Sequence, residues 1–232
     1  MRSSRRHSYA RGVIFLFAIL VGVALKADDL TNGGFESSYF RSWNLDNQAA
    51  GFGSFIIANG TTTPVSGRPT AGPATGAFYA VTDQEGPGAT ALSQFFTIPP
   101  GPSQVLLSFD MFVNDWSGAG PIVSPAGLDY TAFPNQHARV DILTADARPF
   151  DTAGGVLMNL YLGVDPGANP HPYTHYEFDI TSVVGGGGTF RLRFAQVDNL
   201  FFQNMGVDNV AIRRGRGAPT TASETAEPKL YP

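Results

Sequence analysis

The sequence predicts an all-β fold, an antiparallel β-sandwich, on three observations. Short β-rich runs recur between clusters of Gly, Pro, Asn and Asp. Several runs alternate apolar and polar residues at every second position, which is the period of a strand with one buried face. Most connections are too short for the crossover helices that parallel strands need, and no stretch has the pattern of a long amphipathic helix.

Nine runs are predicted as strands, at 52–58, 77–82, 89–98, 104–114, 137–144, 156–162, 174–180, 189–197 and 207–213. In 189–197 the apolar residues alternate with Arg191 and Arg193, and in 137–144 they alternate with Arg139 and Asp141. This alternation predicts one face in the core and one face in water for both strands. Two connections, 59–75 and 117–135, are long and rich in Gly and Pro, which is typical of functional or disordered loops.

The first 27 residues have the pattern of a signal peptide. Arg2, Arg5, Arg6 and Arg11 precede an uncharged apolar run at 12–25, which is short for a bilayer span of about 20 residues. Small residues near Ala27 favour cleavage there; an uncleaved anchor is the alternative. The predicted organisation is a signal peptide at 1–27, a β-sandwich domain at 28–214 and a disordered tail at 215–232. We expect a protein secreted to the periplasm or beyond, without a membrane span after cleavage.

The charge balance changes when this leader is set aside. Five of the 15 basic residues lie in it and none of the 19 acidic residues does, which leaves 10 basic and 19 acidic residues. A domain this acidic lacks the basic surface that nucleic acids require, so a nucleic-acid partner is not expected. The chain has no cysteine, which excludes thiolate nucleophiles, zinc–thiolate sites and iron–sulfur clusters.

Three stretches resemble known families. The segment 30–36 (LTNGGFE), followed by Phe40 and Trp43, resembles the opening of galactose-binding-like jelly rolls, which include many carbohydrate-binding modules. The segment 206–212 (GVDNVAI) resembles their closing strand. The segment 189–199 (TFRLRFAQVDN) is similar to the penultimate strand of exported bacterial proteins with PEP-CTERM sorting signals, although the sorting tail itself is missing here. The resemblance implies a jelly-roll sandwich whose first and last segments lie close together.

The resemblance also implies a structural calcium ion near that junction. Glu36 and Asp208 match the acidic positions of the two ends, and Asn32 and its neighbouring glycines have oxygens to add. Calcium takes six to eight oxygen ligands, carboxylates mixed with carbonyls. The alternative is that Glu36 and Asp208 accept hydrogen bonds from backbone amides in turns.

A candidate ligand site lies where the strand 104–114 runs into the second long loop. Asn114, Asp115 and Trp116 place an indole beside two hydrogen-bonding side chains, and Tyr130 further along the loop adds a second aromatic face. Carbohydrate-binding sandwiches use aromatic faces for sugar C–H groups and polar side chains for hydroxyls. The alternative for each aromatic residue is an ordinary place in the core or at its rim, which we prefer for Trp43.

Catalytic motifs are absent from the sequence. There is no G-x-S-x-G elbow, and the acidic residues are scattered without a distinguishable pair. The sequence therefore predicts a secreted, non-catalytic binding module whose partner is a glycan or cell-surface polymer. One alternative is a structural or adhesive component of the cell surface or biofilm matrix without a small ligand; a hydrolase is the other.

Overall fold

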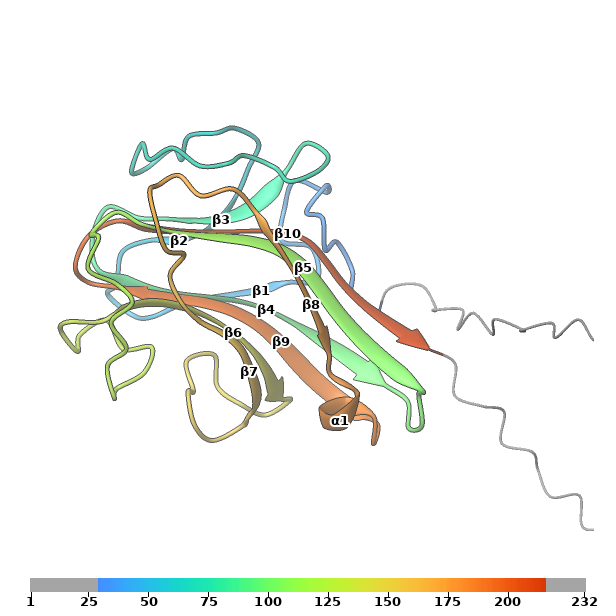
Figure 1. Cartoon of the computed structure of the whole chain (residues 1–232). Coiled ribbons are helices and arrows are strands. Elements are labelled where there is room, and N and C mark those ends of the chain that lie inside the picture. Colours follow the sequence, from blue (N-terminus) through green and yellow to red (C-terminus); the bar gives the residue numbers. More distant parts are fainter. Residues whose placement is uncertain (1–28, 216–232) are drawn as a thin grey trace, which may run out of the picture.

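The structure, a computed structural model, describes residues 29–215 and consists of two antiparallel sheets packed face to face (Figure 1). One sheet has the strand order β1-β4-β9-β6-β7 and is called the β9 sheet after its central strand; the other, the β10 sheet, has the order β2-β3-β10-β5-β8. The elements are β1 (Asn44–Asn47), β2 (Ser54–Ala58), β3 (Tyr79–Asp83), β4 (Gly88–Ile98), β5 (Gln104–Asp115), β6 (Gln136–Thr144), β7 (Val156–Gly163), β8 (Thr174–Asp179), α1 (Thr181–Val184), β9 (Gly188–Asp198) and β10 (Gln203–Gly215).

The predicted β-sandwich is confirmed, and β2 to β10 correspond to the nine predicted strands. The strand that the sequence did not predict is β1, which reads NLDN and is exposed along most of its length. It forms because it pairs with β4, with Asn44 opposite Ser93 and Asn47 opposite Thr90. The predicted signal peptide and almost all of the predicted tail lie outside the described residues. No helix within 29–215 is long and apolar enough to cross a membrane.

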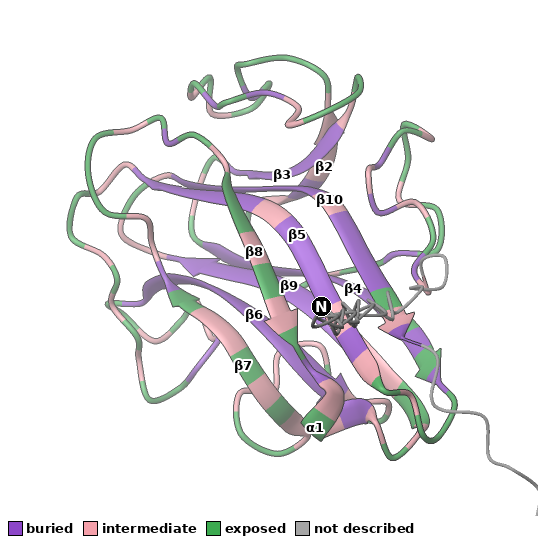
Figure 2. Cartoon of the chain, turned by 45° about the vertical axis from the view of Figure 1, so that its right-hand side comes forward, coloured by how far each residue is buried: buried purple, intermediate pink, exposed green. Residues whose placement is uncertain are grey.

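The main core lies between the sheets, where alternate residues of the central strands meet. Phe109 of β5 packs edge-on against Phe194 of β9, with ring centroids 5.2 Å apart. Trp43 is buried in this core and lies 6.1 Å from the same Phe194 ring. Figure 2 shows that the central strands are buried along most of their length, whereas β7 and β8, at the edges of their sheets, are more exposed.

The outer face of the β9 sheet is covered around Asp141 and Arg193, which corrects the predicted wet face of β6 and β9 there. Arg193 and Asp141 are fully buried and are joined by an ion pair of 2.6 Å, and Arg139 binds the same carboxylate at 2.7 Å. Arg193 also donates to the carbonyls of Pro149 and Asp151, at 2.7 Å each. The connection between β6 and β7 therefore lies over this face, and the alternating charged residues form a buried network beneath it.

The N-terminal segment runs against β10, as the resemblance implies. The Asp29 amide donates to the Ile212 carbonyl (2.9 Å), and the Val210 amide donates to the Gly33 carbonyl (3.0 Å). The approach is so close that a Cβ atom on Gly33 would lie 1.8 Å from the Val210 carbonyl oxygen, so glycine is required there. This junction places Glu36 near Asp208.

Candidate functional site

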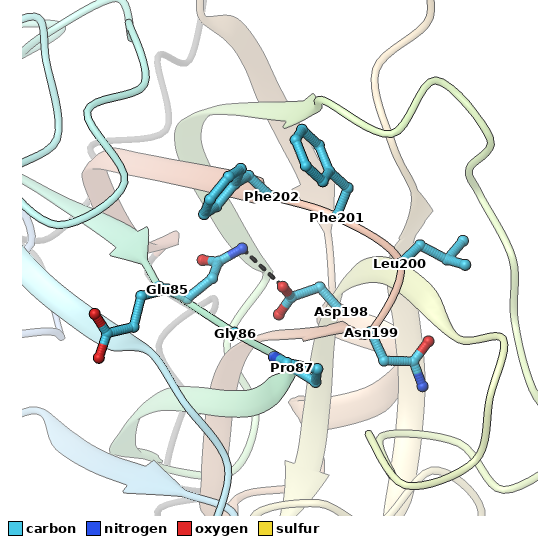
Figure 3. Close-up of a pocket in the computed structure, with 9 residues that line it drawn as sticks. Glu85, Gly86, Pro87, Asp198, Asn199, Leu200, Phe201 and Phe202 are labelled. Atoms are coloured by element: carbon cyan, nitrogen blue, oxygen red, sulfur yellow. Dashed lines mark hydrogen bonds between the residues drawn. The ribbon is translucent and has the colours of Figure 1, made fainter.

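A pocket of about 220 Å³ lies at one end of the sandwich, between two neighbouring turns. One turn joins β3 to β4 and contributes the residues from Gln84 to Pro87; the other joins β9 to β10 and contributes those from Asp198 to Phe202 (Figure 3). We call it the hairpin pocket. The turns come together because β4 and β9 are neighbours, with Gly88 opposite Asp198.

The polar groups of the hairpin pocket include a buried carboxyl–amide pair. Gln84 Nε2 donates to Asp198 Oδ2 at 2.8 Å (Figure 3). Burial raises the pKa of Asp198 well above its usual value, and the hydrogen bonds from Gln196 and Gln84 only partly offset this effect. A raised pKa favours the protonated carboxyl group, which has one O–H donor and an acceptor oxygen. A ligand hydroxyl also donates and accepts, so it can form hydrogen bonds of both kinds with this group.

Aromatic rings form another part of the wall. Phe201 is 48% exposed and lies 4.8 Å from Phe202, centroid to centroid. The guanidinium of Arg68, from the connection between β2 and β3, lies over Phe202, Phe201 and Trp116 at 4.6, 5.0 and 5.2 Å. Cation–π contacts of this kind fix the positions of the rings. A side of the pocket is thus apolar and held in place before any ligand arrives.

The turn that carries Phe201 is also anchored through its backbone. Gln136 Oε1 accepts the amides of Leu200 and Phe201 at 3.1 and 3.4 Å, and Gln136 Nε2 donates to Asp115 Oδ1 at 2.7 Å. Asn199 Nδ2 donates to the Tyr130 carbonyl at 2.6 Å. These bonds connect the pocket to the long 117–135 loop, and a prearranged turn lowers the entropic cost of binding.

The four predicted ligand-binding residues lie around this network, and the structure does not bring them together in one site. Trp116 belongs to the cluster around Arg68, and its Nε1 donates to Asn204 at 3.1 Å. Tyr130 instead packs on the outer side of β4 and β9 and donates to the Ala49 carbonyl at 3.1 Å. Asn114 accepts the His171 amide at 2.7 Å. The carboxylate of Asp115 accepts the amides of Ser117 and Gly120, at 2.9 and 2.8 Å.

Asn114 and Asp115 thus use their oxygens to order the neighbouring loops.

The pocket residues Asp198, Phe201 and Phe202 were not identified from the sequence. One signal was present: the turn 199–202 reads NLFF, which places three large apolar residues in a short connection where polar residues are usual.

The predicted calcium residues form a clamp on the connection between β2 and β3. Glu36 Oε1 accepts the amides of Ala77 and Phe78, each at 3.1 Å, and Asp208 Oδ2 accepts those of Ala74 and Thr75, at 2.9 and 3.1 Å. Burial raises the pKa of Asp208, and these amide hydrogen bonds partly offset it. The groups that face both carboxylates are N–H donors, so this donor set fits the amide-binding alternative better than a calcium ion.

The third residue, Asn32, closes a local turn. Its side chain accepts the Ser37 amide at 3.3 Å and donates to the Tyr39 carbonyl at 3.0 Å. Within 29–215, no three His, Asp or Glu side chains gather in a metal-binding arrangement. Calcium binding therefore stays a prediction, and a melting experiment tests it.

No protein-family model matches the sequence, and a search of curated proteins finds no match either. Solved structures do match. The carbohydrate-binding module TmCBM61, solved in complex with β-1,4-galactotriose, is 12% identical with a TM-score of 0.51 over 82% of this chain and 99% of that one. A Stig cyclase from Fischerella sp. TAU (12%, TM-score 0.48, 84% and 100%) and the CBM22-1 xylan-binding domain of Paenibacillus barcinonensis Xyn10C (10%, 0.44, 80% and 94%) are also similar. The likeness to TmCBM61 shows that this chain has a β-sandwich fold of that kind.

Proposed function

We propose that this chain is a secreted, non-catalytic carbohydrate-binding module that takes a sugar residue in the hairpin pocket. The observation that carries the proposal is the composition of that pocket, where exposed Phe201 lies beside the buried Asp198–Gln84 pair. The sandwich fold shared with TmCBM61 supports the same class of function, although a fold by itself does not determine one.

The chemistry of the pocket matches the two kinds of surface on a pyranose. Its C–H face packs on an aromatic ring, and its hydroxyls each donate and accept a hydrogen bond. Phe201 and Phe202 supply rings, while Asp198 and Gln84 supply polar atoms. The small volume of about 220 Å³ suits a single sugar residue better than a long stretch of chain.

Secretion is part of the proposal and rests on the N-terminal pattern of Arg2 to Ala27. The second candidate, an adhesive matrix component without a small ligand, is separated from the first by a binding experiment. It predicts no affinity for any soluble glycan.

Affinity electrophoresis tests the proposal. Native gels contain β-1,4-galactan, arabinoxylan or barley β-glucan, and we expect at least one to retard the chain. Phe201→Ala should raise the Kd for that polymer, obtained from the retardation at several polymer concentrations, about tenfold, which corresponds to about 1.4 kcal/mol. Phe133→Ala is the matched control, because Phe133 is 73% exposed but does not line the pocket.

Migration that none of the three polymers alters, or equal retardation of Phe201→Ala and wild type, contradicts the proposal. Because Glu85 and Asp198 both line the pocket, the same polymers are also incubated with the protein and assayed for new reducing ends. We expect none; a release of reducing ends that Asp198→Asn abolishes would identify a hydrolase instead.

A further inference from the structure

A second hollow lies on the β9 sheet, away from the hairpin pocket. It has a volume of about 460 Å³ and is lined by residues of β1, β4 and β9 together with Pro149 from the connection between β6 and β7. We call it the β1–β4 groove. Phe95 is 42% exposed there, and the guanidinium of Arg191 lies over its ring at 4.5 Å. Trp43 lies under the groove and belongs to the core.

Two polar atoms of this groove have no hydrogen-bond partner within the described part of the chain. They are the hydroxyl of Ser93, a residue only 1% exposed, and Nε of Arg191. A buried polar atom without a partner costs about 1–3 kcal/mol. Native proteins keep few such atoms, and each calls for an explanation such as a bound molecule. Two of them beside one exposed aromatic ring indicate a ligand site.

The remaining groups of the groove define the class of ligand. Arg191 provides donors, Asp46 provides acceptors, and the Ser93 hydroxyl and the Asn44 amide provide both. One cation and one anion balance each other, so the groove has no preference for a charged ligand. A ligand that both donates and accepts along its length, and that has an apolar face for Phe95, is a neutral saccharide.

We propose that the β1–β4 groove is a second saccharide-binding site, separate from the hairpin pocket and specific for neutral glycans. Arg191 and Asp198 are seven residues apart on β9, which corresponds to about 23 Å along a strand. The ligand class is shared with the proposed function, but the residues are not.

The two tryptophans of the chain allow the sites to be followed separately. Trp43 lies at the β1–β4 groove, and Trp116 contacts Arg68 beside the hairpin pocket. In Trp116→Phe the emission comes from Trp43 alone. This variant is titrated with β-1,4-galactan, arabinoxylan, barley β-glucan and, as an anionic probe, polygalacturonate.

We expect a saturable change in Trp43 emission with at least one neutral polymer and none with polygalacturonate. Adding Ser93→Ala should weaken the response at least fivefold without lowering the melting temperature, because its hydroxyl has no partner to lose. Phe95→Ala should weaken it similarly. Phe133→Ala, a substitution at a residue that lines neither the groove nor the hairpin pocket, should leave the response unchanged.

The outcomes separate the two proposals. If Phe201→Ala abolishes gel retardation and no neutral polymer changes Trp43 emission, the groove is not a site and the proposed function stands. If Ser93→Ala and Phe95→Ala both respond as the parent does, or if polygalacturonate alone produces the change, the second site as defined is also refuted. Absence of any response in both assays refutes both proposals.

Discussion

We expect His137 to couple the stability of the fold to pH. It lies on β6 and is fully buried, its Nδ1 is 3.3 Å from the Ile122 carbonyl, and its Nε2 has no partner among the described residues. A neutral ring with the proton on Nδ1 fits this place. A second proton on Nε2 would be buried without an acceptor, so burial lowers the pKa of His137 to about 4.

The sign and size of the effect follow from this shift. The pKa of His137 is about 6.5 in the unfolded chain and about 4 in the folded chain. Between these two pH values the unfolded state binds more protons than the folded state, so acid favours unfolding. The contribution of His137 to the free energy of unfolding is complete above pH 7. It falls by about 2 kcal/mol at pH 5 and by about 3 kcal/mol at pH 4.

The assay compares urea unfolding of wild type and His137→Gln at pH 7 and pH 5. Gln keeps a donor for the Ile122 carbonyl but does not titrate, so effects of the other ionisable groups cancel in the difference. We expect the stability advantage of wild type over the variant to shrink by about 2 kcal/mol from pH 7 to pH 5. His137→Met provides a second non-titrating variant if Gln folds poorly.

A constant difference between wild type and either variant across this range would refute the reasoning. It would mean that His137 titrates alike in the folded and unfolded chain. If the free energy of unfolding of the wild type alone did not change with pH, the reasoning would not be refuted, because Asp198 changes stability with pH in the opposite direction. Its raised pKa stabilises the fold in acid, and this contribution is lost as the pH rises through the folded pKa.

Three further predictions concern the stability of the fold, the first two measured by urea unfolding and the third by thermal melting. Asp141→Asn should lower the free energy of unfolding by about 3–5 kcal/mol, because it leaves two arginines buried without their carboxylate; a loss below 1 kcal/mol would contradict the network. Asp198→Asn should gain stability relative to wild type as the pH rises from 5 to 8, and parallel profiles would argue against a buried carboxyl group. If the calcium prediction holds, calcium at a hundredfold excess over its Kd adds about 2.7 kcal/mol to wild type and little to Glu36→Gln; melts with chelator and with calcium that superimpose would contradict it.

The strands were predictable because their pattern is local, and the strand that was missed shows the limit. β1 has one apolar residue, Leu45, among polar ones, so nothing in its own sequence indicates a strand. It exists through its pairing with β4, which lies more than 40 residues further along the chain. Pairing between distant segments leaves no periodic signal in a short edge strand.

The alternation around Arg193 and Asp141 was informative in one respect and misleading in another. It correctly placed these residues on the face opposite the core. Periodicity identifies which residues share a face, but it does not reveal whether a loop covers that face. Here the carbonyls of Pro149 and Asp151 accept hydrogen bonds from Arg193, and both residues belong to an irregular connection.

The candidate site was harder to predict than the fold for a related reason. Asn114, Asp115 and Trp116 lie at the correct end of β5, next to the residues that support the pocket. The pocket itself is made by two turns that are more than 100 residues apart, at Gln84 and Asp198. A site assembled by the meeting of turns becomes visible only when the strand order is known.

The position of β10 at the centre of its sheet has a consequence for how the domain is made. A nascent chain that has emerged only as far as residue 202 contains two separate pieces of the β10 sheet, β2 with β3 and β5 with β8. Each piece is a two-stranded pair, which is only marginally stable alone. The edges of β3 and β5 stay open to wrong partners until residues 203–215 emerge and join them. The β10 sheet can therefore form only after this segment has emerged, and deletion of the segment should leave half of the sandwich unassembled.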